Sequence, residues 1–194
     1  MDRETRKYWA EQRRQMLRRD RQQRGYTSTD LIVTKIILAL MVLSYLVDRF
    51  LPAAIATMAS APGGMVWMLL WSALFPGSLL GLIFAGVFIW IIGSQLEGLT
   101  EWWQYLVIFV VSGVFGSVAA RLLSGGLASG MFAAFGLAGA YVMAMTNRRV
   151  GGMAQWALFL LAINVILSGF NPPTLAGMLV AFFVGLSVAR WLNV

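Results

Sequence analysis

Long apolar stretches with almost no charged residues inside them dominate this sequence after residue 30. A helix needs about 20 apolar residues to cross the hydrocarbon core of a bilayer. The apolar stretches approach that length, and together they occupy most of the chain beyond residue 30. We therefore predict an all-α integral membrane protein with six spans, near residues 31–50, 79–96, 105–123, 124–146, 153–167 and 174–192.

Composition and charge placement agree with this class of protein. The chain of 194 residues is 59% hydrophobic and 12% charged, which is more apolar than a soluble domain of that size requires. Most Lys and Arg residues lie in residues 1–30, and Arg148, Arg149 and Arg190 fall on the same predicted side of the membrane. Because basic residues accumulate on the cytoplasmic side, we expect both termini in the cytoplasm. We predict a basic cytoplasmic N-terminal tail over 1–30 and one membrane domain over 31–194.

The tail permits two interpretations. It is either a solvated helix that sets the topology, or a helix that lies on anionic lipid or docks a cytoplasmic partner. No apolar core occurs in it, so we expect no cleavable signal peptide. With the small size and the lack of Cys, this favours a bacterial plasma membrane. The net charge of +7 follows from the predicted topology, and we expect no nucleic-acid partner.

Two residue types are missing from the chain. It contains no Cys, which excludes disulfides and thiolate ligands, and no His, the commonest general base and transition-metal ligand. We therefore expect no metal and no cofactor.

The segment between the first two predicted spans is apolar but interrupted. Residues 51–64 are rich in Ala, Met, Gly and Pro, and residues 66–78 are too short to span before Pro76-Gly77 breaks them. We predict a half-embedded outer hairpin here, anchored at the membrane surface by Trp67 and Trp71.

Small residues mark two of the later spans. Ser124 to Gly139 consists mostly of Gly, Ala and Ser, so other helices can approach its backbone closely. We predict that this helix lies at the centre of the bundle. In the sixth span, small residues four positions apart form a smooth ridge that favours packing on the fourth. The positions expected to pack or to bind a partner here are Gly126, Gly130, Gly136, Gly177, Ala181 and Gly185.

The order of these elements resembles the rhomboid family of intramembrane serine proteases over roughly residues 31–192. Residues in the first loop and second span agree with the family pattern: Trp67, Ala73-Leu74, Ser78-Leu79, Gly93 and Glu97. At the family's Arg position, however, this chain has Met68. Its His-x-x-x-Asn positions hold Gly81 and Ala85. We expect Glu97 to act as a structural acceptor near the inner surface.

The fourth span is similar to the family's Gly-x-Ser-Gly element in two registers. Either Ser129 is the nucleophile and Leu127 replaces the preceding glycine, or Gly126-Leu127 opens the motif and Ala128 occupies the serine position. The second register also aligns Gly136 with a family glycine. In the sixth span, Thr174 stands where the family has its catalytic His.

A serine hydroxyl without a base and an oxyanion donor is a poor nucleophile. The resemblance therefore implies a rhomboid-like pseudoprotease that binds transmembrane segments of partner or client proteins, for scaffolding, quality control or trafficking. Two alternatives stay open. One alternative is an atypical intramembrane serine endopeptidase that uses Ser129, and the other is a structural subunit of a larger membrane complex.

Overall fold

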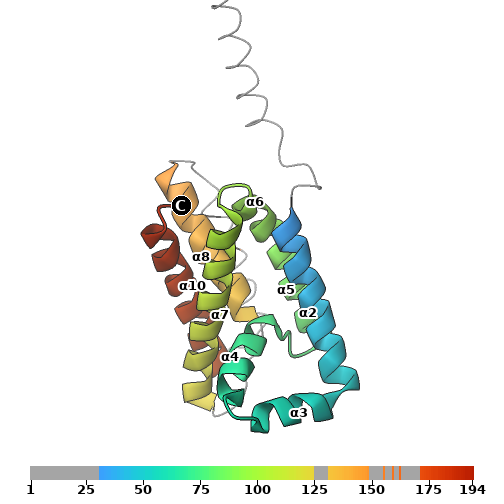
Figure 1. The fold of residues 1–194 in the computed structure, drawn as a ribbon. Helices are drawn as coiled ribbons and strands as arrows, with labels where there is room; N and C mark the ends of the chain where they lie inside the picture. Colours follow the sequence, from blue (N-terminus) through green and yellow to red (C-terminus); the bar gives the residue numbers. More distant parts are fainter. Residues whose placement is uncertain (1–30, 125–130, 149–154, 156–158, 160–161, 163–170) are drawn as a thin grey trace, which may run out of the picture. The chain divides into compact units, whose positions relative to one another are not determined.

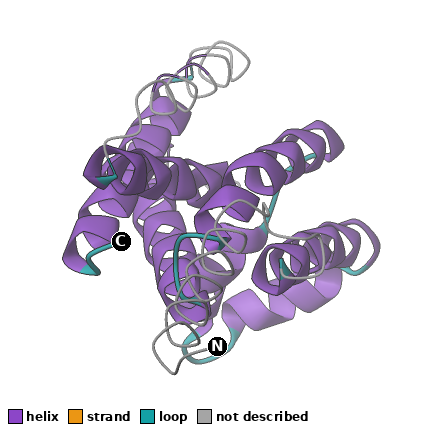
Figure 2. Cartoon of the chain, turned by 90° about the horizontal axis from the view of Figure 1, so that it is seen from above, coloured by secondary structure: helices purple, strands orange, loops and turns teal. Residues whose placement is uncertain are grey.

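Helices make up all the regular structure in the described part of the chain (Figures 1 and 2). This computed structural model describes residues 31–124, 131–148, 155, 159, 162 and 171–194, and the basic tail lies outside them. The chain divides after Ile32, and residues 33–194 form one packed unit. The prediction of an all-α protein is confirmed. The helices are α2 (Ile32–Phe50), α3 (Pro52–Ser60), α4 (Gly64–Leu74), α5 (Leu79–Phe88), the π-helix η1 (Ile89–Gly93), α6 (Ser94–Glu97), α7 (Trp102–Ser124), α8 (Met131–Asn147) and α10 (Pro172–Trp191).

Three of these helical segments are long and apolar enough to cross a membrane. They are the continuous run Leu79–Glu97, α7 and α10, which match the predicted second, third and sixth spans. The predicted first span is α2, which qualifies only together with α3, so the described residues hold three or four candidate spans. The predicted fourth span corresponds to α8, an apolar helix of 17 residues. The predicted fifth span, 153–167, lies almost wholly outside the described residues.

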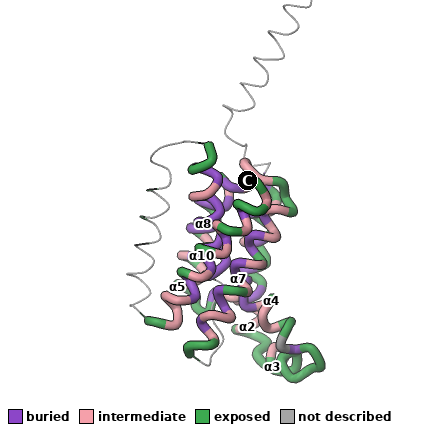
Figure 3. The backbone as a smooth tube through the Cα atoms, turned by 90° about the vertical axis from the view of Figure 1, so that its left-hand side faces the viewer, coloured by how far each residue is buried: buried purple, intermediate pink, exposed green. Residues whose placement is uncertain are grey.

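The chain turns by 97° between α2 and α3. Proline cannot continue a helix but suits the first position of one, and Pro52 opens α3 directly after Leu51. None of the residues of α3 is buried (Figure 3). Residues 51–64, predicted to be too broken to span, thus contain a nine-residue helix that runs across the end of α2 (Figure 1).

A glycine reverses the chain between α3 and α4. Gly63 has φ of 81°, a left-handed conformation that favours glycine, and it forms the N-cap of α4. Helix α4 then packs on α7, where a Cβ atom on Gly113 would lie 2.8 Å from the Cβ of Ala73. The hydroxyl of Ser72 donates to the Ser117 hydroxyl across the same contact, at 2.9 Å.

The core of the unit is formed by α7, α8 and α10, which contact one another pairwise (Figure 1). Every residue of α8 from Phe132 to Tyr141 is buried, as the purple trace in Figure 3 shows. Helix α5 contacts α8 from another side, with the ring centroids of Phe88 and Phe135 5.5 Å apart. This burial agrees with the central position that the small-residue composition predicts for this helix.

Candidate functional site

Small residues of three helices meet where α7, α8 and α10 cross. We call this cluster the small-residue junction. Its members are Ser112, Gly113 and Gly116 on α7, Gly136 and Gly139 on α8, and Gly177, Ala181 and Gly185 on α10.

Backbone touches backbone between α8 and α10. A Cβ atom placed on Gly185 would collide with the carbonyl oxygen of Gly136, and one on Gly139 would collide with the carbonyl oxygen of Phe182. Because a peptide carbonyl in a helix cannot swing aside like a flexible side chain, only glycine fits at these two positions. The ridge predicted on the sixth span therefore lies directly against α8.

Helix α7 closes the third side of the junction. A Cβ on Gly136 would overlap the Ser112 side chain, and a Cβ on Gly116 would lie 2.9 Å from the Gly177 carbonyl oxygen. The Ser112 hydroxyl donates to the Ile108 carbonyl within its own helix at 2.6 Å. The junction is thus close-packed and its hydroxyl is satisfied, which suits it to holding helices together.

The first turns of α8 and α10 lie side by side. A Cβ on Gly177 would lie 2.5 Å from the Phe132 ring. Thr174, which the rhomboid resemblance aligns with a catalytic His, is half-buried one turn before Gly177. The residues expected to supply or replace the nucleophile and its neighbours lie outside the described residues: Gly126, Ala128, Ser129 and Gly130.

Gly81 and Ala85, which the same resemblance aligns with the family's His and Asn, lie on α5. The backbone N–H of Gly81 donates to the Ser78 hydroxyl, which caps the helix, at 3.0 Å. A Cβ on Gly81 would collide with the carbonyl oxygen of Pro76, so a side chain there requires the chain to move. Ala85 is only 1% exposed and lies in the apolar core. Neither position offers a polar side chain.

Glu97 holds the start of α2. Its two carboxylate oxygens accept the backbone N–H groups of Val33 and Thr34, each at 2.8 Å. First-turn amides have no partner within their helix, and a negative charge is favourable at that end. The sequence suggested an acceptor role for Glu97 but not its partners, which lie more than 60 positions earlier in the chain.

Other buried polar contacts gave no signal in the sequence. The Ser44 hydroxyl donates to the Leu74 carbonyl at 2.8 Å and ties α2 to the end of α4. Tyr105 is fully buried, with its hydroxyl 3.4 Å from Thr34 Oγ1 and against Gly93. Single serines and tyrosines in apolar helices do not indicate which distant group they will meet.

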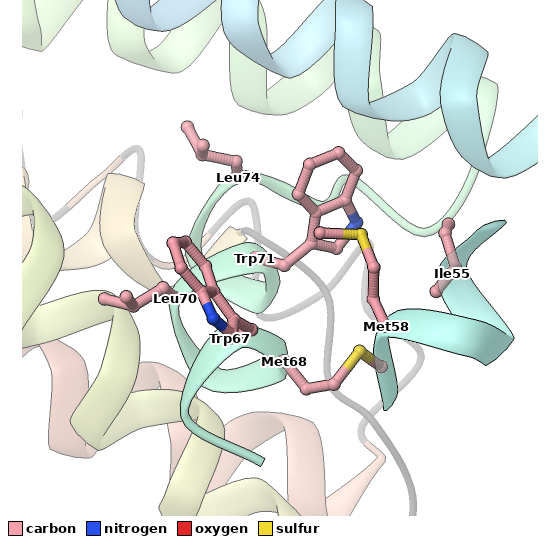
Figure 4. Close-up of a pocket in the computed structure, with 7 residues that line it drawn as sticks. All are labelled: Ile55, Met58, Trp67, Met68, Leu70, Trp71 and Leu74. Carbon is pink, nitrogen blue, oxygen red and sulfur yellow. The ribbon is translucent and has the colours of Figure 1, made fainter. Parts of the chain in front are cut away.

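The two tryptophans predicted to anchor the outer segment lie on α4, beside an apolar pocket (Figure 4). Trp67 is 61% exposed, whereas the indole nitrogen of Trp71 is buried and has no hydrogen-bond partner within the described ranges. The pocket is formed between α3 and α4 and is lined by Ile55, Met58, Trp67, Met68, Leu70, Trp71 and Leu74.

A scan against models of known protein families finds no match to this chain, and a search of curated proteins finds none either. A functional assignment therefore rests on the sequence and on the geometry of the described residues.

Proposed function

We propose that this chain is a rhomboid-like membrane pseudoprotease, a six-span bundle with a half-embedded outer hairpin that binds transmembrane segments of other proteins. In this proposal both termini are cytoplasmic and the membrane is a bacterial plasma membrane. The tail offers a basic surface to anionic lipid or to a cytoplasmic partner.

One observation supports the part of the proposal that the protein has no protease activity. At Gly81, where the family has a polar side chain, the Pro76 carbonyl oxygen occupies the space that a Cβ would need. With Ala85 buried in the core, neither of these two positions supplies a side-chain donor for an oxyanion, and the whole sequence contains no His to act as base. A lost base costs about 10²–10⁴ in rate and a lost oxyanion donor about 10²–10³.

The part of the proposal that the protein binds client helices rests on the exposed face of α5. Leu80, Ile83 and Val87 are each more than half exposed and lie on one side of the helix. In the rhomboid arrangement, the second and fifth spans flank a lateral entry for a substrate helix. An apolar face there suits a client helix, which would pack along the exposed side of α5.

The first test addresses catalysis. The purified protein in lipid is treated with a fluorophosphonate probe for activated serine, beside Ser129→Ala and an active rhomboid protease. We expect no labelling of this chain while the active protease is labelled. Labelling that disappears in Ser129→Ala would establish the alternative of an atypical serine endopeptidase.

The second test addresses binding. A diazirine amino acid replaces Ile83 or Val87 on α5, and Phe115 on α7 serves as an equally exposed control. We expect adducts with transmembrane proteins from the α5 positions and mainly lipid adducts from Phe115. Lipid adducts alone at all three positions would refute client binding. Loss of co-purifying partners on deletion of residues 1–24 would show a scaffold docked through the tail, and their retention would show one that binds through the membrane domain alone.

A further inference from the structure

The pocket between α3 and α4 combines an apolar lining with one unsatisfied donor. Its seven lining residues are aliphatic, thioether or aromatic, and none carries a charge. The Trp71 indole N–H is buried there without an acceptor among the residues that the structure describes. Figure 4 shows the nitrogen edge of the Trp71 ring turned towards the side of the pocket that Ile55 and Met58 line. A buried donor of this kind is costly to leave unpaired, so an acceptor from outside the chain is expected.

Water is a poor candidate for this acceptor. An ordered buried water needs two to four polar partners, and the only polar side-chain groups in this lining are the indole N–H groups of Trp67 and Trp71. The ligand that fits has a long apolar body and a single carbonyl acceptor. The pocket is open to such a body, because Met58, Trp67 and Leu70 are all substantially exposed at its rim.

The position of the pocket in the fold further limits the kinds of ligand that can bind there. Helix α3 leaves α2 at 97°, so it runs across the end of an apolar helix rather than along it. At the end of a span, tryptophan lies at the membrane interface, where glycerolipids also carry their ester carbonyls. A client helix offers no equivalent acceptor, because its backbone carbonyls are bonded within the helix.

We propose that this pocket binds one acyl chain of a membrane glycerolipid, with the Trp71 indole N–H donating to the ester carbonyl of that chain. The site recognises the ester and the chain. It does not distinguish headgroups by charge, because no charged side chain lines it. The proposal is independent of whether the protein is a pseudoprotease.

The test compares two lipids that differ only in the acceptor. The full chain is reconstituted in nanodiscs that contain a phosphatidylcholine with a diazirine in one chain, linked either by esters or by ethers. After irradiation, adducts on peptides containing residues 55–74 are quantified by mass spectrometry. We expect about 2- to 10-fold more adduct from the ester lipid, the range that one hydrogen bond supplies.

Two variants assign the difference to the indole N–H. Trp71→Phe keeps an aromatic ring but removes the donor, so ester labelling should fall to the ether level. Trp67→Phe, on the same helix and in the same pocket, should keep the difference between the lipids. Equal labelling of the unaltered protein by both lipids would overturn the proposal, and this result does not depend on any variant folding. Persistence of the difference in Trp71→Phe would also overturn it.

Discussion

The glycines of the small-residue junction act by lacking a side chain. Gly136 and Gly185 place the backbones of α8 and α10 in direct contact, and Gly139 does the same against Phe182. Within a membrane the hydrophobic effect does not drive helices together, so close packing of this kind contributes much of the association energy.

We predict that Gly185→Leu destabilises the protein, whereas Ser187→Leu does not. Leucine at position 185 must displace the Gly136 carbonyl, and overpacking of this kind costs about 1–3 kcal/mol. Ser187 is exposed on the same helix and has room for the larger side chain. Thermal unfolding in detergent measures both variants. Equal melting temperatures would show that α10 is not held against α8 as described.

The Glu97 carboxylate leads to a second prediction at this scale. Glu97→Gln leaves one oxygen for two backbone N–H groups, so one amide of α2 loses its acceptor. The expected loss is about 1–3 kcal/mol of stability. The matched control is Glu101→Gln, at an exposed carboxylate that accepts from the Trp103 indole, with an expected change within about 0.5 kcal/mol. Hydrogen exchange at Val33 and Thr34 should rise only in the Glu97 variant.

At the scale of elements, the π-helix η1 interrupts the apolar helix that runs from Leu79 to Glu97. Short π-segments inside α-helices insert a residue and often mark specialised sites. Here η1 ends at Gly93, whose backbone lies against the buried Tyr105 hydroxyl of α7. The π-helix and α7 therefore meet with no space for a methyl group.

This contact is tested by a double-mutant cycle. Gly93→Ala should destabilise by about 1–3 kcal/mol, because its methyl collides with the tyrosine oxygen. Tyr105→Phe removes that oxygen, so the double variant should lose less than the sum of the single variants, with a coupling of about 0.5–3 kcal/mol.

Gly86→Ala on α5 is the control for the same substitution. Its nearest neighbour would be a Leu38 methyl group at 3.8 Å, an ordinary contact. Replacing a glycine inside a helix is then neutral or stabilising by about 0.5–1 kcal/mol. Strict additivity at residues 93 and 105 would contradict the packing described for η1.

At the scale of the whole packed unit, small side chains occupy the closest helix contacts, and many large apolar side chains lie exposed on the surface. The junction is built from Gly, Ala and Ser, while Leu80, Leu122 and Phe183 are all at least 60% exposed. In water such a surface would be an aggregation liability, but in a bilayer it faces a solvent of matching polarity. This distribution and the three or four candidate spans support a membrane protein.

The predicted orientation can be measured with single cysteines, because the chain contains none of its own. Gln15→Cys in the tail and Thr146→Cys at the end of α8 should react with a membrane-impermeant maleimide only after permeabilisation. Ser60→Cys, at the end of α3, should react in intact cells. The reverse pattern would invert the topology inferred from the basic residues.

The sequence alone was sufficient to locate several helices. Composition over a window of about 20 residues is a local property, and it correctly predicts the helices near 31–50, 79–96, 105–123 and 174–192. It did not predict the helix α3, because residues 51–64 were interpreted only as too broken to span, whereas the ring of Pro52 suits the first turn of a new helix.

For the candidate site too, the sequence predicts some features and not others. The spacing of Gly177, Ala181 and Gly185 predicts a smooth helix face, since residues four apart share one side of a helix. Only the tertiary structure decided that Gly136 presents its carbonyl to Gly185, that Pro76 occupies the space above Gly81, and that Glu97 caps a helix 63 positions away at Thr34. The physical reason is that hydropathy and side-chain size belong to single residues. Which backbone groups touch depends on how distant helices cross, and that is settled only when all of them pack together.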